Sequence, residues 1–353
     1  MQSPPGLDLE ALARFLDARG IGREGPLDAD LIAGGRSNLT YRVSDGASTW
    51  VVRRPPLAHV LPTAHDMARE WRVISALQDT AIPVPGAVAF CDEPGVVGAP
   101  FYVMEHVEGH VVRDRLPAEW PQTAATLEAM AGALVDTLVS IHDVRPADAG
   151  LGDFGRPDGF LERQVRRWWQ QWEASKTRDL PAIDELHRRL VAGLPPQSAA
   201  GIVHGDYRFD NLIYARDDPG RVAAVVDWEM STVGDPLCDL GLLVVYWVTD
   251  RDDPAARALP GGGATLGDGL PSREAMLTSY ARRSDRDLTH LEWYVALGHY
   301  KLAIIAEGIN ARFLLGMTVG DGFETMGPAV PLIVESALQR ATESRLAGLA
   351  GGG

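Results

Sequence analysis

The chain has 353 residues, of which 46% are apolar, and a formal net charge of -15. This length is more typical of two lobes or domains than of one core, and the acidic balance argues against a general nucleic-acid-binding protein. Cys91 and Cys238 are too few for a disulfide framework or a Cys-based zinc site. The N-terminus lacks the features of a secretory signal, and the longest apolar run, residues 240–248, is too short to cross a bilayer. We therefore expect a cytoplasmic protein with no nucleic-acid or membrane partner.

The first part of the chain predicts a short amphipathic helix followed by strands around a glycine pair. Gly34 and Gly35 separate two strand-like segments, and Ser37 and Asn38 follow them directly. One interpretation is a hairpin whose backbone and small polar side chains approach nucleotide phosphates. The other is an ordinary Gly-Gly hairpin turn, and the pair alone does not distinguish them.

A further strand, residues 49–54, ends in two arginines, Arg53 and Arg54, and is stopped by two prolines. Apolar residues then recur at helical spacing over residues 66–77, and this helix carries Glu70. Without further information the arginines could be solvated surface residues beside an unrelated glutamate. Residues 101–109 then predict a strand that runs into a Glu-Gly turn.

From about residue 122 the apolar pattern becomes helical. A long helix ends near residue 143, and a basic, tryptophan-rich helix follows over residues 159–173. Arg163, Arg166 and Trp169 in this second helix could contact an anionic substrate. In the alternative interpretation the tryptophans pack inside and the arginine stems cover them.

Residues 201–229 contain two strand-like apolar runs: Asn211 opens the run at residues 212–214, and Asp227 ends the run at residues 222–226. A strand, a turn and a strand would bring Asp206, Asn211 and Asp227 together. An amide and a carboxylate are hard oxygen ligands for Mg²⁺, and the remaining carboxylate can accept a proton from a hydroxyl group. A lone Asp-x4-Asn more often caps a turn, but the full string is more specific.

The last part of the chain is expected to be mainly helical. Asp239 lies at the start of an apolar helix, where an aspartate is also a good cap. Residues 254–271 are rich in Gly, Pro and Asp and predict a mobile loop without a P-loop motif. Lys301 and Glu307 are candidates to line an acceptor cleft, although most polar residues here should face solvent. The later helical segments are residues 273–280, 291–313 and 329–346.

Two motifs in this chain are specific enough to indicate a family. His-Gly-Asp-x4-Asn at residues 204–211 and Asp-Trp-Glu at residues 227–229 resemble motifs of the aminoglycoside phosphotransferase and choline kinase-like family. The resemblance covers nearly the whole chain, because the glycine pair, cationic strand, helix glutamate and hinge-like turn come in kinase order. Segments at residues 159–164 and 227–236 resemble the branch that occurs in stand-alone bacterial proteins and fused to acyl-CoA dehydrogenases.

The resemblance implies an α+β, protein-kinase-like fold with two lobes. Residues 1–104 would form a small lobe with an antiparallel sheet and one or more helices. Residues 105–110 would form the hinge, and residues 111–353 a larger, mainly helical lobe that holds the catalytic loop and the acceptor site.

The resemblance also implies a bound nucleotide, ATP or GTP, with its adenine or guanine against the hinge. Arg53 would hold the phosphates and Glu70 would position it, with arginine in place of the more familiar lysine. The residues implied in nucleotide binding are Gly34, Gly35, Ser37, Asn38, Arg53, Glu70, Met104, Glu105 and Val107.

The same resemblance implies roles for residues in the stretch 201–229. Asn211 and Asp227 would bind Mg²⁺, and Asp206 would orient and deprotonate the acceptor hydroxyl. His204 and Asp239 would support the catalytic loop through hydrogen bonds. The expected activity is phosphoryl transfer to a hydroxyl group of a small molecule.

The acceptor is less well determined than the chemistry. For the branch that this chain resembles, a hydroxylated acyl chain or its CoA thioester is at least as plausible as an antibiotic. A catalytically silent nucleotide- or ligand-binding protein is the main alternative, and a metal-dependent hydrolase using Asp206, Asp227 and His204 is a weaker one. The sequence specifies neither the acceptor nor the oligomeric state.

Overall fold

The computed structural model describes residues 3–32, 38–57, 66–113, 115–249, 269–318 and 322–351. The chain divides into two compact units. Unit 1 comprises Met1–Gly109 and Ala223–Ser231, and unit 2 comprises His110–Val222 and Thr232–Gly353. Most of the loop expected at residues 254–271 lies outside the described residues.

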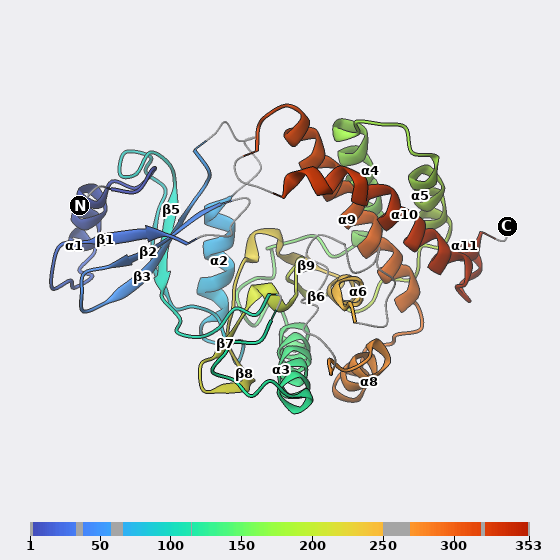
Figure 1. Ribbon diagram of the computed structural model, residues 1–353, viewed down its shortest axis with the longest axis horizontal. Coiled ribbons are helices and arrows are strands. Elements are labelled where there is room, and N and C mark those ends of the chain that lie inside the picture. Colours follow the sequence, from blue (N-terminus) through green and yellow to red (C-terminus); the bar gives the residue numbers. More distant parts are fainter. Residues whose placement is uncertain are drawn as a thin grey trace. The chain divides into compact units, whose positions relative to one another are not determined.

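Unit 1 is built on a five-stranded antiparallel sheet with the strand order β1-β2-β3-β5-β4 (Figure 1). Helix α2 packs against β4 and β5. The elements are α1 (Leu9–Ala18), β1 (Asp28–Leu31), β2 (Leu39–Ser44), β3 (Thr49–Arg54), α2 (Met67–Leu77), β4 (Ala87–Cys91), β5 (Phe101–Glu105) and the short helix η2 (Trp228–Met230).

The α-helices α1 and α2 of unit 1 are each preceded by an aspartate that caps them. Asp8 accepts the Ala11 N–H at 2.9 Å, and Asp66 accepts the Arg69 N–H at 3.0 Å. Each bond satisfies one of the backbone donors that a helix N-terminus leaves without a partner. Leu12 of α1 is fully buried in the core beneath the sheet. The cap and the apolar stripe together explain why these segments are helical.

Unit 2 is mainly helical and holds two short two-stranded sheets, β6 with β9 and β7 with β8. Strand β8 (Asp218–Val225) begins in unit 2 and ends in unit 1. The other elements are α3 (Ala124–Asp143), α4 (Phe160–Ser175), α5 (Pro181–Ala192), β6 (Gly201–Val203), η1 (Phe209–Asn211), β7 (Leu212–Ala215), β9 (Thr232–Gly234), α6 (Leu237–Tyr246), α8 (Arg273–Arg283), α9 (Leu291–Leu314), η3 (Phe323–Thr325), α10 (Met326–Thr342) and α11 (Ala347–Ala350).

Helix α9 is the central helix of unit 2 and packs against α4, α5, α6 and α10 (Figure 1). Most of its residues are buried, which is the pattern of a helix surrounded by protein on several sides. Trp293 is fully buried near its start, and its indole N–H donates to the Leu190 carbonyl at 3.0 Å. The bond satisfies the polar end of a large core side chain.

Helix α3 is, by length and composition, the one described helix that could cross a membrane. In its most apolar window 61% is buried inside the protein. The hydroxyl of Tyr207 donates to its Leu134 carbonyl at 2.8 Å, and the hydroxyl of Tyr214 donates to its Met130 carbonyl at 3.3 Å. These contacts place α3 in the core of unit 2.

A buried histidine in α9 makes stability depend on pH. His299 is 4% exposed, and burial lowers its pKa from 6.5 to about 4. Between pH 4 and 6.5 the unfolded chain binds more protons than the folded protein does. The stabilisation that comes from keeping His299 neutral is therefore complete above pH 6.5 and is lost as the pH falls towards 4. At about 1.4 kcal/mol per pKa unit the loss amounts to about 3 kcal/mol.

Urea unfolding of the wild type and of His299→Gln over this pH range checks the prediction. The stability advantage of the wild type over the variant should shrink steadily as the solution is acidified. A difference that stays constant with pH would show that His299 does not titrate in this way.

Candidate functional site

The loop after β6 is held in place by one buried carboxylate. Asp239 accepts the His204 N–H at 2.6 Å and the Gly205 N–H at 2.8 Å. Gly205 has a φ of +89°, a conformation that glycine adopts without strain. The N–H of Asp206 then donates to the His204 ring at 3.2 Å. The two residues predicted to support this loop, His204 and Asp239, thus both accept hydrogen bonds from its backbone.

Asp239 is fully buried and nonetheless favours its charged form. Burial alone would raise the pKa of its carboxyl, but His142, His204 and the loop N–H groups outweigh burial and lower it. His142, whose Nε2 lies 3.6 Å away, has a pKa lowered by burial. The loop is therefore anchored to a carboxylate inside the core.

We expect Asp239→Ala to destabilise the fold by about 3 kcal/mol, because two buried N–H groups would lose their acceptor. Asp239→Asn, which keeps one acceptor oxygen, should cost less. Urea unfolding measures both, and Asp217→Ala at an exposed position serves as the control. If Asp239→Ala were as stable as Asp217→Ala, the carboxylate would not be the anchor.

The Asp206 side chain follows directly and receives several contacts. The Asn211 amide donates to the Asp206 carbonyl at 2.7 Å and to Oδ2 at 3.0 Å. The Tyr246 hydroxyl donates to Oδ1 at 3.2 Å, and Arg208 Nε lies 3.5 Å from Oδ2. Burial raises the pKa of Tyr246, so this hydroxyl stays protonated as a donor. The carboxylate is fixed in orientation but remains partly exposed.

Tyr246 and Arg208 were not singled out in the sequence. The Arg208 guanidinium lies over the Tyr246 ring, 5.1 Å from its centroid, so the two side chains support each other. The signal that could have found Tyr246 is a hydroxyl-bearing residue in an otherwise apolar run at the end of α6.

Lys301 and Glu307, which were expected to line an acceptor cleft, both form hydrogen bonds within unit 2. The Lys301 ammonium donates to the Gly205 carbonyl and lies 5.6 Å from the centroid of the Trp168 ring. Glu307 has no exposed surface and accepts the N–H and hydroxyl of Thr177, each at 2.7 Å. Lys301 thus supports the loop that follows β6. Glu307 fastens the segment before α5 to α9 and cannot face a solvent-filled cleft.

In helix α4 the structure shows tryptophan packing, and contact of its arginines with a substrate stays a prediction. Trp169 stacks on His187 of α5 with 4.4 Å between ring centroids, as a packing residue does. Arg163 donates to the backbone carbonyls of Arg156 and Asp158, whereas Arg166 is exposed. Trp169 is therefore a packing residue. The two arginines differ, because Arg163 is bonded to the preceding backbone and Arg166 faces solvent.

In unit 1 the strand arginine is at the centre of a buried ion-pair network. Arg53 Nε donates to Glu70 Oε2 at 3.1 Å, and Nη2 donates to Asp227 Oδ1 at 2.5 Å. Nη2 also lies 3.5 Å from Glu229 Oε2. Burial works against the charge of Arg53, but the carboxylates outweigh it and raise its pKa well above the ordinary value. Burial raises the pKa of Glu70, and Arg53 opposes this rise. A solvated surface pair is therefore excluded.

The two neighbouring arginines point to opposite faces of the sheet, as alternation along a strand requires. Arg54 donates to the carbonyls of Gly6 and Val97, each at 2.6 Å. It holds the N-terminal segment against the sheet. Of the two, Arg53 is the residue that faces the acidic cluster.

Asp227 is, among the described residues, the non-glycine residue with positive φ, at 67°. Aspartate and asparagine tolerate this left-handed region better than most residues. Two residues later, Glu229 accepts the amide of Asn38 at 2.9 Å.

The Asn38 carbonyl oxygen is buried without a partner among the described residues. Gly34, Gly35 and Ser37 lie outside the described residues.

The segment expected to be the hinge begins at the end of β5. Met104 is buried in the sheet, and the Glu105 N–H already donates to the Gly86 carbonyl at 2.8 Å. The Glu105 side chain is exposed, and Val107 is half-buried. The role of these residues in binding a nucleotide base stays a prediction.

The residues expected to bind Mg²⁺ have suitable chemistry. Because the Asn211 nitrogen donates to Asp206, its carbonyl oxygen is the atom left for a cation, and the Asp227 carboxylate is 30% exposed. The described residues contain no group of three or more His, Cys, Asp or Glu that could hold a metal. Mg²⁺ commonly uses one or two protein groups together with substrate phosphates. Each of the two residues, taken by itself, therefore offers an oxygen atom of the kind that Mg²⁺ accepts.

Comparison with known proteins identifies the family. Residues 28–276 match the sequence model of the phosphotransferase enzyme family. The chain belongs to this family. Acyl-CoA dehydrogenase family member 11 from Pongo abelii and from Homo sapiens are each 34% identical over 94% of this chain and 42% of their own length. The chain thus spans about two fifths of the length of these two relatives.

Solved structures of phosphotransferases share the fold. A Ralstonia eutropha protein assigned as an aminoglycoside phosphotransferase is 31% identical, with a TM-score of 0.80 over 96% of this chain and 99% of that one. A thermostable mutant of aminoglycoside phosphotransferase APH(4)-Ia, in a ternary complex with ADP and hygromycin B, is 13% identical, with a TM-score of 0.61 over 94% and 99%. The expected family and the α+β, kinase-like fold are confirmed, and the family indicates a phosphotransferase.

Proposed function

We propose that this phosphotransferase uses Mg²⁺ and ATP to transfer the γ-phosphoryl group to a hydroxyl group of a small molecule. The observation that carries the proposal is the fixed, partly exposed carboxylate of Asp206 in the His-Gly-Asp-x4-Asn loop. A carboxylate so held can orient a hydroxyl group and accept its proton. Transfer then joins the hydroxyl oxygen to the γ-phosphorus and releases the bridging oxygen with ADP.

The other residues of the proposed site would bind the nucleotide phosphates and neutralise their charge. Arg53 would contact the nucleotide phosphates, and Glu70 fixes its guanidinium group from the other side. Asn211 and Asp227 would hold Mg²⁺, which, when bound, neutralises charge on the phosphates. In this reaction type most of the rate comes from positioning and electrostatic stabilisation. GTP is the competing nucleotide, and Met104, Glu105 and Val107 are the proposed contacts of the base.

For the acceptor we propose a hydroxylated acyl compound or its CoA thioester ahead of an aminoglycoside. The support is the 34% identity with proteins named for acyl-CoA dehydrogenation, two fifths of whose length this chain matches. A cytoplasmic location remains a prediction.

The test is a transfer assay with purified protein, Mg²⁺ and γ-labelled ATP or GTP. The acceptors are hydroxyacyl-CoA esters, free hydroxy acids and aminoglycosides, and Asp206→Asn protein is the background control. Label on an acceptor hydroxyl that requires both Mg²⁺ and Asp206 supports the proposal. ATP binding without transfer to any acceptor would favour the catalytically silent binding protein instead.

A further inference from the structure

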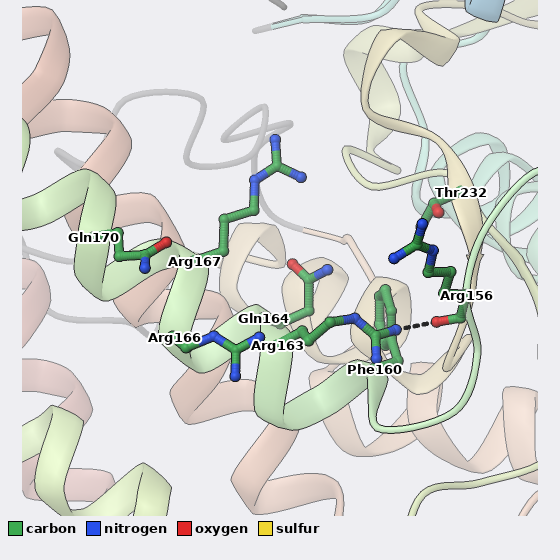
Figure 2. Close-up of a pocket in the computed structure, with 8 residues that line it drawn as sticks. All are labelled: Arg156, Phe160, Arg163, Gln164, Arg166, Arg167, Gln170 and Thr232. Carbon is green, nitrogen blue, oxygen red and sulfur yellow. Dashed lines mark hydrogen bonds between the residues drawn. The ribbon is translucent and has the colours of Figure 1, made fainter.

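Unit 2 contains a hollow of about 370 Å³ beside the first turns of α4. Figure 2 shows Gln164 and Arg167 rising from the same side of the helix, with Arg156 extending towards them from the preceding segment. We call it the arginine hollow. Its lining residues are Arg156, Phe160, Arg163, Gln164, Arg166, Arg167, Gln170 and Thr232.

The charge of the arginine hollow is opposite to that of the whole chain. Four arginines and no acidic side chain line it, although the net charge of the protein is -15. Within the part of the chain that the structure describes, Arg156, Arg166 and Arg167 have no ion-pair partner. A cluster of like charges repels itself, so it is most stable with an anion bound.

Contacts within unit 2 also hold parts of the arginine hollow in place. Arg163 donates to the Arg156 carbonyl (Figure 2). It also donates to the Asp158 carbonyl, and the two bonds fix the segment that carries Arg156. Phe160 packs against Gly234, where a side chain would collide with its ring. The segment that carries Arg156 and the first residue of α4, Phe160, are therefore each held by a side-chain contact.

Two connections join the arginine hollow to the catalytic loop within unit 2. Thr232, in its lining, pairs with Val203, and Val203 comes directly before the loop that carries Asp206. Next to Arg167, Trp168 lies under Lys301, whose ammonium donates to the Gly205 carbonyl. The hollow is thus linked to the loop that carries Asp206 by one strand pair and by the side chains of Trp168 and Lys301.

We propose that the arginine hollow binds a phosphate or pyrophosphate group of the acceptor, at a distance from the hydroxyl that reacts. Guanidinium groups bind phosphate oxygens in a forked, two-bond geometry, and the volume lies in the range of small-ligand sites. The same arginines would repel a polycationic aminoglycoside. The inference rests on the proposed phosphotransferase function and narrows its acceptor to an anionic, phosphate-bearing alcohol.

The first test measures binding without catalysis. Inorganic pyrophosphate is titrated into protein saturated with Mg²⁺-ADP, so that the nucleotide site is already filled, and heat is recorded. The double variant R156Q/R167Q should bind pyrophosphate at least about tenfold more weakly than the wild type. The matched control R188Q/R221Q removes two exposed, ion-paired arginines elsewhere and should bind as the wild type does. No binding by the wild type, or equal loss in both double variants, overturns the proposal.

The second test asks whether the bound phosphate belongs to the acceptor. The same hydroxyacyl group is offered as its CoA thioester and as its pantetheine thioester, which lacks the phosphates. The wild type and R188Q/R221Q should prefer the CoA ester at least about tenfold in kcat/KM, mainly through KM, and R156Q/R167Q should lose this preference. A preference that persists in R156Q/R167Q overturns the proposal. Absence of transfer to both esters counts against the proposed function, and the pyrophosphate titration still decides whether the hollow binds phosphate.

Discussion

Replacing Asp206 by asparagine is expected to lower kcat for phosphoryl transfer by about 10²- to 10⁴-fold, the usual contribution of a general base. Asparagine has nearly the same shape but cannot accept the hydroxyl proton. The contacts from Asn211 at 3.0 Å and Tyr246 at 3.2 Å hold the wild-type carboxylate in one orientation. The loss should therefore come from chemistry, with little change in KM for ATP.

Single-turnover transfer from labelled ATP, together with nucleotide binding, measures the two effects separately. Asp217→Asn, which neutralises an exposed carboxylate near the same loop in sequence, is the matched control. Full transfer activity in Asp206→Asn would remove Asp206 from the mechanism. Loss of ATP binding together with transfer would indicate a damaged fold instead, and urea unfolding would detect it.

Short-range features of the site were predictable because the chain itself brings the residues together. Asp206 and Asn211 are five positions apart, and the single turn of η1, which ends at Asn211, allows the 3.0 Å contact. The β3 strand has the bounds that its sequence predicted, because two prolines directly follow it. Likewise, Asp66 directly precedes α2 and caps it, as a helix-start aspartate should.

Long-range features could not be predicted in the same way. Tyr246 reaches Asp206 from a position 40 residues later, and no local pattern marks that distance. The choice between Arg53 and Arg54 depends on which face of the sheet each occupies, and this is decided by the register of β3 with its neighbours. Glu307 was expected beside an acceptor as a polar residue of a long helix, but hydrogen bonds from Thr177 and an ion pair with Arg178 at 3.2 Å allow it to be buried.

One helix was missed although its sequence carries a start signal. Helix α5 (Pro181–Ala192) begins with a proline at its first turn, and Ile183, Leu186 and Leu190 are its buried positions. Proline is favoured at the start of a helix because its missing N–H is not needed there. The apolar spacing of three and four residues would have completed the prediction.

Replacing Asp227 by asparagine is expected to lower transfer by about 100-fold or more, since one charged group is lost at a proposed metal site. Asparagine also tolerates the φ of 67° at this position, whereas alanine would add backbone strain. The Mg²⁺ concentration needed for half-maximal activity should rise. ATP binding should weaken only in part, because Arg53 and its partner Glu70 remain.

Glu229→Gln is the matched control, because Glu229 also carries a negative charge near Arg53, at 3.5 Å, but is not a proposed ligand. Both variants remove one carboxylate from the Arg53 network, so both should change stability in similar ways. Only Asp227→Asn should shift the Mg²⁺ dependence. If the two variants lost activity equally and at the same Mg²⁺ requirement, Asp227 would act by holding Arg53, and the metal would have to be assigned to other residues.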